Sequence, residues 1–423
     1  MFMNSLKALR FLAAMAFAAA ALKVSANGFR LPDQDAFATA RGEAFVATAD
    51  NPSAIYYNPA GITQLKGDQL RAGIYAIYLD PTFTPPGGGR TYQIRQNFGG
   101  IPQLFYTHTL ESFPLSFGLG VYVPYGGSVT WPHNTGFNAV ATKGSLTYLR
   151  VNPVVAYKIL PSLSIAAGAM VNYARIDLEQ DLRPYPSRFA NFFRFSGEGW
   201  SAGYNLGLLW QPVEKISLGA TFRSATTMPF EGQTKFELQP LAGLSTPQER
   251  RARADFEFPM TVVCGLSYRP TPKWNLEFDA DYTDWSSFGV VNIHQVAPPR
   301  PFTANVPVTL NWQPSWMYEF GATRYFDNGW HASAGYVFNE NSVPDARYTP
   351  LAADLDRHFL SVGVGRKGKK FDFDMAYQFG YGPDRTVTGS KPSSKPADFA
   401  NQKADGTYEF MSHAVIVTVG MHF

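Results

Sequence analysis

A cluster of aromatic side chains is the clearest candidate for a chemical role in this sequence. Five rings fall within eleven residues: Tyr185, Phe189, Phe192, Phe193 and Phe195. Such rings perform no covalent chemistry, but they bury apolar molecules, and exposed apolar patches mark binding sites. The spacing of Phe189, Phe192 and Phe193 predicts that these three rings share one helical face. The stretch therefore predicts an apolar binding surface, or alternatively a small core that packs the loop itself.

A second apolar stretch follows about forty residues later. It carries three leucines, Leu238, Leu241 and Leu244, and then Thr246-Pro247-Gln248-Glu249. The last four residues have the pattern of a capping box, which predicts the start of a helix. We expect both stretches to be external loops that contribute to ligand capture.

Residues typical of catalysis or metal binding are not arranged for either task. The histidines, which include His108, His133, His294 and His331, lack metal-ligand spacing, and no serine lies in a nucleophile motif. The lone cysteine, Cys264, alternates with apolar residues and is interpreted as a small lipid-facing side chain. The sequence thus predicts neither an enzyme nor a cofactor.

The elements that must position these stretches have the pattern of β-strands. Apolar side chains alternate with polar ones in fourteen segments, an even number as a closed antiparallel barrel requires. The segments are 69–80, 100–110, 115–130, 145–159, 163–181, 200–211, 216–230, 256–268, 274–291, 308–326, 330–339, 358–366, 371–381 and 408–423. We expect six short turns at the periplasmic end, such as 327–329 and 367–370, and seven longer external loops.

The composition agrees with a transmembrane β-barrel. After the first thirty residues no segment is apolar for eighteen positions, which excludes a helical membrane protein. A barrel strand needs only about 9 to 11 residues to cross the membrane. Aromatic residues make up 15% of the chain and charged residues 16%, as a wall in contact with lipid requires.

Two segments show which face of the wall meets lipid. In 274–291, Trp274, Leu276 and Phe278 alternate with Glu277 and Asp279. In 371–381, the apolar and acidic residues alternate in the same way. A charge at the lipid midplane costs about 2–4 kcal/mol, so the acidic rows are expected to face the lumen.

The chain before the first strand divides into two parts. Residues 1–26 have a basic start, an alanine-rich apolar stretch and Val24-Ser25-Ala26, which predict a signal peptide cleaved after Ala26. The predicted signal peptide contains three basic residues. Its removal leaves 33 basic and 33 acidic residues, so the mature chain has no excess of basic residues that would suggest nucleic-acid binding. Residues 27–66 contain turn and helical signals and are predicted to plug the lumen of the barrel, 67–423.

In order along the chain, several motifs resemble those of the long-chain fatty acid and hydrocarbon transporters of Gram-negative outer membranes (FadL/TodX type). They are Gly28-Phe29-Arg30-Leu31, Asn58-Pro59-Ala60, Leu79-Asp80-Pro81, Gly197-Glu198-Gly199-Trp200, Asn205-Leu206-Gly207, Tyr282-Thr283-Asp284-Trp285-Ser286 and the terminal Phe423. The resemblance implies a fourteen-stranded barrel with an N-terminal hatch. It also implies passive uptake of hydrophobic molecules, which external loops capture and which leave sideways into the membrane.

The resemblance assigns roles to particular residues. Asn58, Pro59 and Ala60 match the hatch motif of the family. In the family, a kink in the third strand makes the lateral opening. Here the third predicted strand contains Val123-Pro124-Tyr125-Gly126-Gly127. Its proline, Pro124, removes a ladder donor, and Gly126 and Gly127 permit a bend. The alternative is that this strand simply ends there.

The interior positions depart from the pattern of the fatty-acid members, which hold the carboxylate with basic side chains. Alignment on Tyr173-Ala174-Arg175 and Asn311-Trp312-Gln313 places Gln180 and Gln313 at those positions. Glutamine suits a neutral ligand, so we expect a preference for uncharged hydrocarbons or less selective binding of fatty acids. Arg175 or Arg183 could replace the missing cations if the alignment shifts.

The expected partners are hydrophobic small molecules, outer-membrane lipid and the barrel-assembly machinery, for a monomer in the outer membrane of a Gram-negative bacterium. An open porin for small solutes is the main alternative function. It would need a water-filled lumen, typically of sixteen or more strands, without a plug. An outer-membrane enzyme that acts on lipids is the second alternative.

Overall fold

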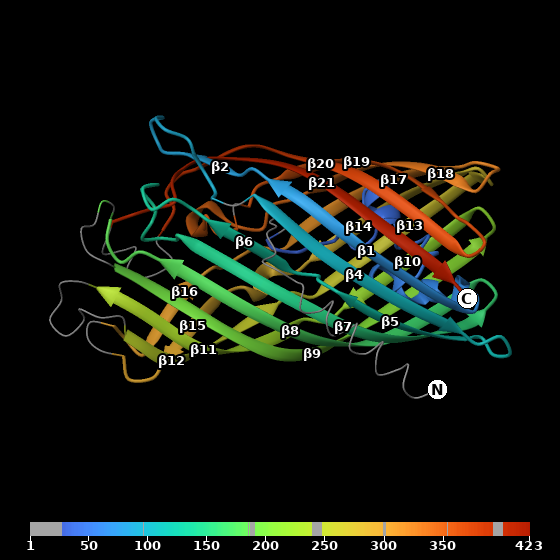
Figure 1. Ribbon diagram of the computed structural model, residues 1–423, viewed down its shortest axis with the longest axis horizontal. Helices are drawn as coiled ribbons and strands as arrows, with labels where there is room; N and C mark the ends of the chain where they lie inside the picture. The colour runs from blue at the N-terminus through green and yellow to red at the C-terminus, as the bar shows by residue number, and fades with distance from the viewer. Residues whose placement is uncertain are drawn as a thin grey trace.

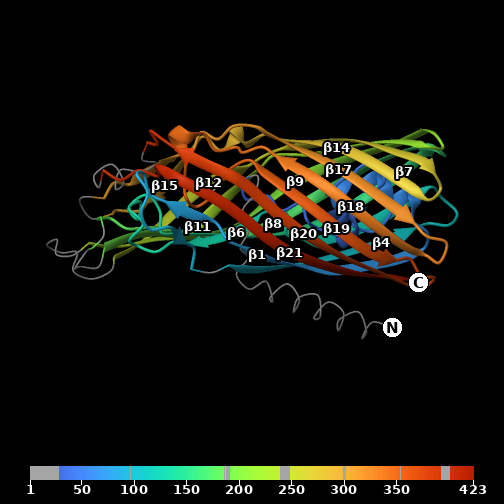
Figure 2. The ribbon, with the colours of Figure 1, turned by 90° about the horizontal axis from the view of Figure 1, so that it is seen from above.

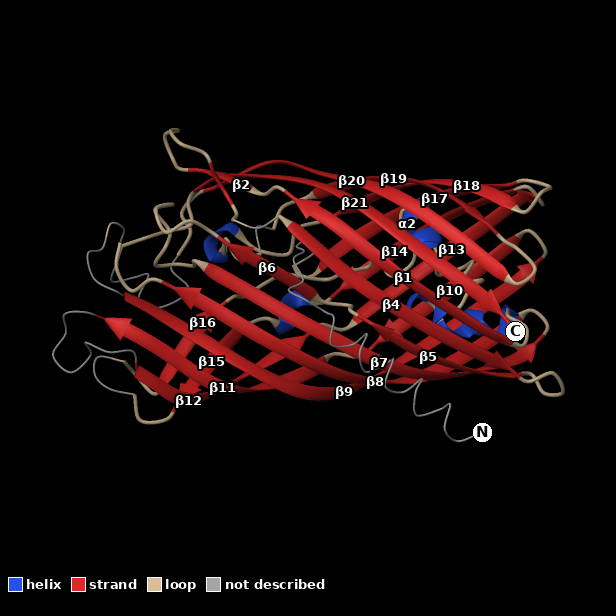
Figure 3. Ribbon diagram, viewed as in Figure 1, coloured by secondary structure: helices blue, strands red, loops and turns tan. Residues whose placement is uncertain are grey.

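The computed structural model describes residues 28–95, 97–184, 186, 191–238, 248–298, 302–352, 354–391 and 401–423, so the predicted signal peptide lies outside the described residues. These residues form a long, tilted β-barrel with a few short helices (Figures 1 and 3). The strands are β1 Asp68–Leu79, β2 Thr82–Thr84, β3 Tyr92–Gln93, β4 Phe98–Thr109, β5 Leu115–Tyr122, β6 Gly126–Thr130, β7 Lys143–Leu160, β8 Leu163–Gln180, β9 Asn191–Val213, β10 Ile216–Arg223, β11 Thr226–Leu238, β12 Gln248–Phe258, β13 Thr261–Thr271, β14 Trp274–Thr283, β15 Val290–Gln295, β16 Asn305–Thr309, β17 Ser315–Tyr325, β18 Trp330–Asn339, β19 Arg357–Arg366, β20 Phe371–Val387 and β21 Gly406–His422. The helices are α2 Ala36–Ala40, α3 Ala54–Tyr57, η1 Pro59–Gln64, η2 Trp285–Ser287 and η3 Asp345–Arg347. No helix among these residues is long and apolar enough to cross a membrane.

Fourteen antiparallel strands close the barrel, as predicted. The ring runs β1, β4, β5, β7, β8, β9, β10, β13, β14, β17, β18, β19, β20 and β21. The last strand returns to the first, with Gln69 opposite His422 and Leu79 opposite Ser412. Closure pairs the backbone of the ring with neighbouring strands and removes the exposed edges that a bilayer does not tolerate.

Five of the predicted strands are broken in two, which the alternation pattern did not reveal. Segments 115–130, 216–230, 256–268, 274–291 and 308–326 each become two strands that pair differently on either side of the break. Pro124, Pro259 and Pro314 stand at three of these breaks. Proline cannot donate to a strand ladder, so the wall loses a hydrogen bond at each one.

The two ends of the barrel differ as expected. Short turns join β4 to β5, β7 to β8, β9 to β10, β13 to β14, β17 to β18 and β19 to β20. These turns lie at the end of the molecule that also holds Phe423, while the longer connections extend from the other end (Figures 1 and 2). The predicted division into six short turns and seven long loops is confirmed.

The two faces of the wall are also confirmed. On β14, Asn275, Glu277, Asp279 and Asp281 are buried inside the barrel, while Trp274, Leu276 and Phe278 are exposed on its outer face. The same division holds on β20, where Phe371 and Phe373 are exposed and Asp374 is buried. Cys264 is exposed on the outer face of β13, as the alternation predicted.

The segment 28–65 lies within the barrel. Figure 3 shows its helices enclosed by the strands, with α2 in contact with β18 to β21 and η1 in contact with β7 to β9. Acidic side chains of β14 hold its backbone: the N–H groups of Phe45 and Val46 each donate to Asp279 Oδ2 over 2.8 Å. Glu277 accepts from the Ala47 N–H over 2.7 Å and pairs with Arg41 over 3.1 Å.

Glycines of the wall let this segment approach the strands closely. A Cβ atom at Gly335 of β18 would lie 1.9 Å from the backbone nitrogen of Gly42, well inside van der Waals contact. Gly42 itself has a φ of +61°, which favours glycine. The acidic row and these glycines therefore fix the segment in one position.

Replacing Asp279 by alanine is expected to loosen this segment. The change leaves two buried backbone donors without their acceptor, and each costs about 1–3 kcal/mol. We expect trypsin to cleave faster after Arg41, which is fully buried, and denaturant to unfold the protein at a lower concentration. Asp255→Ala removes an equal charge from the exposed outer face of β12 and serves as the control. Equal cleavage rates in both variants would contradict this account of the segment.

Candidate functional site

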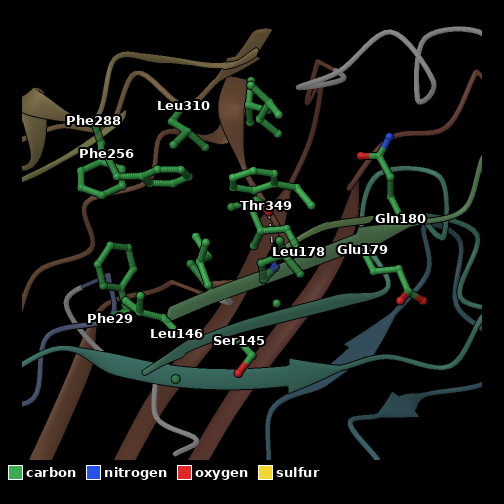
Figure 4. Close-up of a pocket in the computed structure, with 18 of the residues that line it drawn as sticks. Phe29, Ser145, Leu146, Leu178, Glu179, Gln180, Phe256, Phe288, Leu310 and Thr349 are labelled. Atoms are coloured by element: carbon green, nitrogen blue, oxygen red, sulfur yellow. Dashed lines mark hydrogen bonds between the residues drawn. The ribbon is translucent and has the colours of Figure 1, made fainter. Parts of the chain in front are cut away.

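An apolar cavity of about 160 Å³ lies inside the barrel at the end with the long loops. Its walls come from β6, β7, β8, β9, β12, β15 and β16, from four connections between strands and from the chain before β1. The residues that line it are Phe29, Gly127, Val140, Gly144, Ser145, Leu146, Ile176, Leu178, Glu179, Gln180, Phe193, Phe195, Phe256, Phe258, Phe288, Ile293, Val306, Val308, Leu310, Trp312, Thr349, Leu351 and Ala352. Figure 4 shows Phe29, Phe256 and Phe288 grouped on one side, with Glu179 and Gln180 on the other.

A layer of packed rings forms the floor of this cavity. The ring of Phe29 lies 4.9 Å from that of Trp285 and 5.3 Å from that of Phe288, centroid to centroid. Trp312 stacks on Phe288 at 5.3 Å. The rings prefer such edge-to-face and offset contacts because of their quadrupoles. The floor is therefore a continuous layer of aromatic side chains in mutual contact.

The chain can build this floor only with glycine at position 28. Gly28 has a φ of +64°, and a Cβ atom there would lie 2.7 Å from Trp285. A larger residue would clash with the tryptophan and adopt a strained backbone conformation. Gly28 thus allows Phe29 to turn into the cavity.

The predicted aromatic stretch contributes to the cavity, but as a strand. Phe193 and Phe195 belong to β9, point inward and line the cavity, whereas Phe192 lies on the opposite face of the strand. The prediction of a shared helical face for Phe192 and Phe193 is therefore wrong, because the strand pairing with β11 sets a period of two. Tyr185 and Phe189 lie outside the described residues.

The second apolar stretch is mostly outside the described residues, which exclude Leu241 and Leu244. Leu238 is the last residue of β11. Gln248 and Glu249 begin strand β12 rather than a helix, so that part of the capping-box prediction is wrong. Their pairing with Phe236 and Lys235 of β11 explains the difference, and an ion pair of 3.1 Å joins Lys235 to Glu249.

Of the three predicted interior positions, only Gln180 lines the cavity. Gln313 is exposed, and its neighbour Trp312 faces the cavity instead. Arg175 is exposed on the outer face of β8, between the inward-facing Ala174 and Ile176. The interior placement of Gln313 and Arg175 is therefore wrong. Arg175 lies one residue out of phase with the inward face of β8, and Gln313 lies in the connection between β16 and β17.

The strand ladder is interrupted beside the cavity at the break between β5 and β6. β4 pairs with β5 only over Leu104–Thr109, and β6 pairs with β7, so the described residues form no ladder between the outer half of β4 and β6. A backbone hydrogen bond of 2.9 Å from the Arg95 N–H to Thr130 O closes this gap at its outer end. Gly127 belongs to β6 and lines the cavity, so the cavity lies beside this interruption of the ladder.

The interior segment satisfies the backbone at this break. The Leu31 N–H donates to Pro124 O, and the Gly126 N–H donates to Phe29 O, each over 2.9 Å. Arg30 and Tyr125 form an isolated antiparallel bridge between these bonds. The strand that leaves the wall is thus paired from inside by the residues that precede the interior helices.

Asn58 ties the interior segment to the wall on another side. Its Nδ2 donates to the backbone oxygens of Val46 and Leu208 over 2.8 and 2.9 Å. Its Oδ1 accepts from the Ala60 N–H over 3.2 Å, and Pro59 begins η1. The Asn58-Pro59-Ala60 turn therefore has the capping geometry expected from its residue types.

The aromatic floor could not be assigned from the sequence. Phe29 and Trp285 belong to two of the motifs that carried the resemblance, but no ligand role was given to either. No sequence pattern distinguished Phe258, Phe288 or Trp312 from other aromatic residues, because aromatic residues are common in every predicted strand. The rings come together only because β12, η2 and the end of the interior segment meet in three dimensions.

Comparison with known proteins places the chain among outer-membrane transporters. A sequence model of the outer membrane protein transport protein (OMPP1/FadL/TodX) family matches residues 17–423. A long-chain fatty acid transport protein of Escherichia coli O6:H1 is 23% identical over 414 residues, with 89% of each chain covered. A 47 kDa outer membrane protein of Pasteurella multocida is 24% identical over 382 residues, covering 84% of this chain and 86% of the relative.

Solved structures show the same fold. A FadL homologue of Pseudomonas aeruginosa superposes with a TM-score of 0.80 at 17% identity, covering 93% of this chain and 99% of the other. The Pseudomonas putida toluene transporter TodX gives a TM-score of 0.72 at 16% identity, covering 94% of this chain and 100% of the other. At these identities the likeness concerns the fold.

Filling the cavity is expected to abolish binding of a small apolar probe. Leu146→Trp adds a large ring to the cavity wall, so we expect the affinity for benzene, measured by calorimetry, to fall about tenfold or more, which is at least 1.4 kcal/mol. Leu360→Trp makes the same exchange on the outer face, where Leu360 is exposed, and is the control. Unchanged benzene affinity in Leu146→Trp would place the binding site elsewhere.

Proposed function

The chain belongs to the outer membrane protein transport protein (OMPP1/FadL/TodX) family, and on this premise we propose that it is a passive uptake channel for hydrophobic compounds in the Gram-negative outer membrane. External loops capture the compound, the apolar cavity holds it, and the break in the third strand releases it sideways into the bilayer. A long-chain fatty acid transport protein and a toluene transporter are among the similar proteins, in agreement with this proposal.

The single observation that carries the proposal is the cavity itself. Its volume of about 160 Å³ is close to that of an engineered protein cavity of about 150 Å³ that binds benzene. No lysine or arginine is among its lining residues, and Glu179 is its one charged residue. We therefore assign this cavity to the uncharged part of the ligand, with Gln180 as a polar contact at its edge.

Capture is assigned to the loops that surround the cavity. In this proposal Tyr185 and Phe189 precede β9, and Phe193 and Phe195 continue the apolar surface down into the cavity, whereas Phe192 is on the opposite face of β9. Leu238 ends β11, and Leu241 and Leu244 follow it in the connection to β12. A continuous apolar surface of this kind lets a hydrophobic ligand move inward without returning to water.

Release is assigned to the gap beside β6. Pro124 removes a ladder donor, and Gly126 and Gly127 place no large side chain beside the cavity. Two backbone hydrogen bonds then support the broken strand: the Leu31 N–H donates to Pro124 O, and the Gly126 N–H donates to Phe29 O. A lateral exit suits a ligand that partitions into lipid, because its transfer into the acyl chains is favourable.

The interior segment is assigned the role of a hatch, held by Asn58, Pro59 and Ala60. It fills the lower lumen with buried side chains and charged hydrogen bonds. A filled lumen blocks water and ions, so transport needs no open pore and uses only the gradient of the ligand. This division of the mature chain, 27–66 for the hatch and 67–423 for the barrel, is part of the proposal, as is function as a monomer.

Uptake measurements test the proposal directly. Cells with and without the protein are given a labelled fatty acid and a labelled neutral aromatic compound. We expect the protein to accelerate the uptake of at least the neutral compound, because the cavity accepts an uncharged body. Stimulation of neither compound, or a large single-channel ion conductance of the purified barrel, would contradict the proposal and favour an open porin.

Closing the break in the wall is expected to stop uptake. Pro124→Val and Gly126→Val together introduce strand-forming residues, which restore a donor and disfavour the bend. Uptake should fall to near the level of cells without the protein, while the barrel still shows the heat-dependent gel shift of a folded outer-membrane protein. Pro307→Val in β16 is the matched control. Unchanged uptake in the double variant would remove the lateral exit from the proposal.

A further inference from the structure

A mostly apolar groove of about 550 Å³ lies on the outer face of the barrel wall. It crosses β13, β14, β17 and β18, of which the last three lie side by side in Figure 2. Its lining includes Leu276, Phe278, Phe320, Ala322, Ala334 and Tyr336. The groove is separate from the interior cavity, because the two share no lining residue.

The depth of the groove follows from the contact between the wall and the interior segment. A Cβ atom at Gly335 would lie 1.9 Å from the backbone nitrogen of Gly42, so β18 carries no side chain on its inner face there. On the outer face the neighbouring Ala334 pairs with Ala322 of β17, and both side chains are small. The wall is therefore thin between the flanking rings, and this thin part forms the floor of the groove.

The groove ends near the membrane interface on the side of the short turns. Arg324 follows Ala322 by two residues on the same face of β17, and its Cζ lies 5.5 Å from the ring centroid of Trp274. Trp330 and Phe371, at the same end, are exposed on the outer face. Barrels place such girdles of aromatic residues where the lipid head groups begin. Arg324 therefore lies at head-group level, next to an apolar groove that faces the acyl chains.

Two arginines at this end lack a counter-ion. Arg324 is exposed and forms no ion pair with any residue that the structure describes. Arg366 at the end of β19 is also exposed, lies 6.0 Å from the ring centroid of Trp330, and has no ion pair in the described part of the chain. Lys369 and Lys370 follow in an exposed turn. Four cationic side chains thus gather beside the groove.

The acidic groups of the neighbouring turns are already engaged. Asp327 forms an ion pair with Lys273 over 2.8 Å, Asp372 is hydrogen-bonded to His422 over 2.8 Å, and Asp50 forms an ion pair with Lys367 over 3.3 Å. None of these carboxylates is bonded to either arginine. This edge of the barrel therefore presents positive charge to the surface of the membrane.

We propose that the groove and Arg324 form a binding site for one anionic phospholipid of the adjacent leaflet. The guanidinium receives the head-group phosphate, because its paired N–H donors match phosphate oxygens. Arg366 and the two lysines add attraction for the net negative charge of the lipid. One acyl chain lies in the groove between the flanking rings. The site is independent of the uptake function, since it uses none of the residues assigned to uptake.

Native mass spectrometry of the purified protein tests the site. The protein receives equal amounts of dioleoyl phosphatidylglycerol and dioleoyl phosphatidylcholine, which have the same acyl chains and differ in net charge. We expect wild-type protein to retain phosphatidylglycerol about fivefold better or more. Arg324→Gln should lower this retention about fivefold, which is the contribution of one arginine near anionic lipid. Arg175→Gln, an exposed arginine on the outer face of β8, is the matched control and should change nothing.

A second variant tests the groove. Ala334→Phe fills the floor, so it should lower the retention of phosphatidylglycerol several-fold. Val362→Phe places a ring at the exposed position paired with Ala334 on β19, outside the groove, and is the control. Leu146→Trp fills the interior cavity instead and should leave retention unchanged.

The proposal requires a loss in both Arg324→Gln and Ala334→Phe, each checked for folding by the heat-dependent gel shift. Arg366→Gln, with an expected loss in the same direction, replaces Arg324→Gln if that variant does not fold. Equal retention of the two lipids by wild-type protein, or a loss in only one class of variant, overturns the site. A loss in Leu146→Trp would place the lipid in the interior cavity. A dimer that disappears in Ala334→Phe would assign the groove to a second copy of the chain. Either result also overturns the proposal.

Discussion

A strand that leaves its neighbours inside a bilayer must find other partners for its backbone groups, because lipid offers none. This constraint explains the arrangement around the break between β5 and β6. The backbone groups of Pro124 and Gly126 are paired with Leu31 and Phe29 from inside the barrel. The break in the strand and the position of the interior segment are therefore coupled, because the two exchange backbone hydrogen bonds.

The same constraint governs the lower lumen, where charges are buried in large numbers. The acidic side chains of β14 face backbone N–H groups of the interior segment and the guanidinium groups of Arg30 and Arg41. Each buried carboxylate is costly unless it accepts several hydrogen bonds. The lumen thus divides into a polar lower part that fixes the segment and an apolar upper part that stays free for a ligand, with the rings around Phe29 as the boundary.

Much of this arrangement could be predicted from the sequence because it depends on local periodicity. The alternation of Trp274, Glu277 and Phe278 determined which face of the wall meets lipid, and the turn residues determined the two ends. The proline and glycines at 124–127 indicated the break in the third strand, but the other four breaks were missed because alternation continues across them and only the pairing partners change. Arg175 was misplaced because an offset of one residue reverses the face of a strand, and Gln313 because it lies in a connection, where strand alternation gives no direction. The floor depends on contacts between distant segments, such as Phe29 with Trp285, which no local pattern encodes.

The position of Gly28 and Phe29 has a practical consequence for anyone who produces this protein. If the leader is removed after Ala26, a single residue precedes Gly28, whose backbone packs against Trp285 and Trp312. An affinity tag left at the mature N-terminus would then begin next to the ligand cavity and compete with whatever binds there. In that case purification handles are better inserted in a long surface connection, because Phe29 lines the cavity.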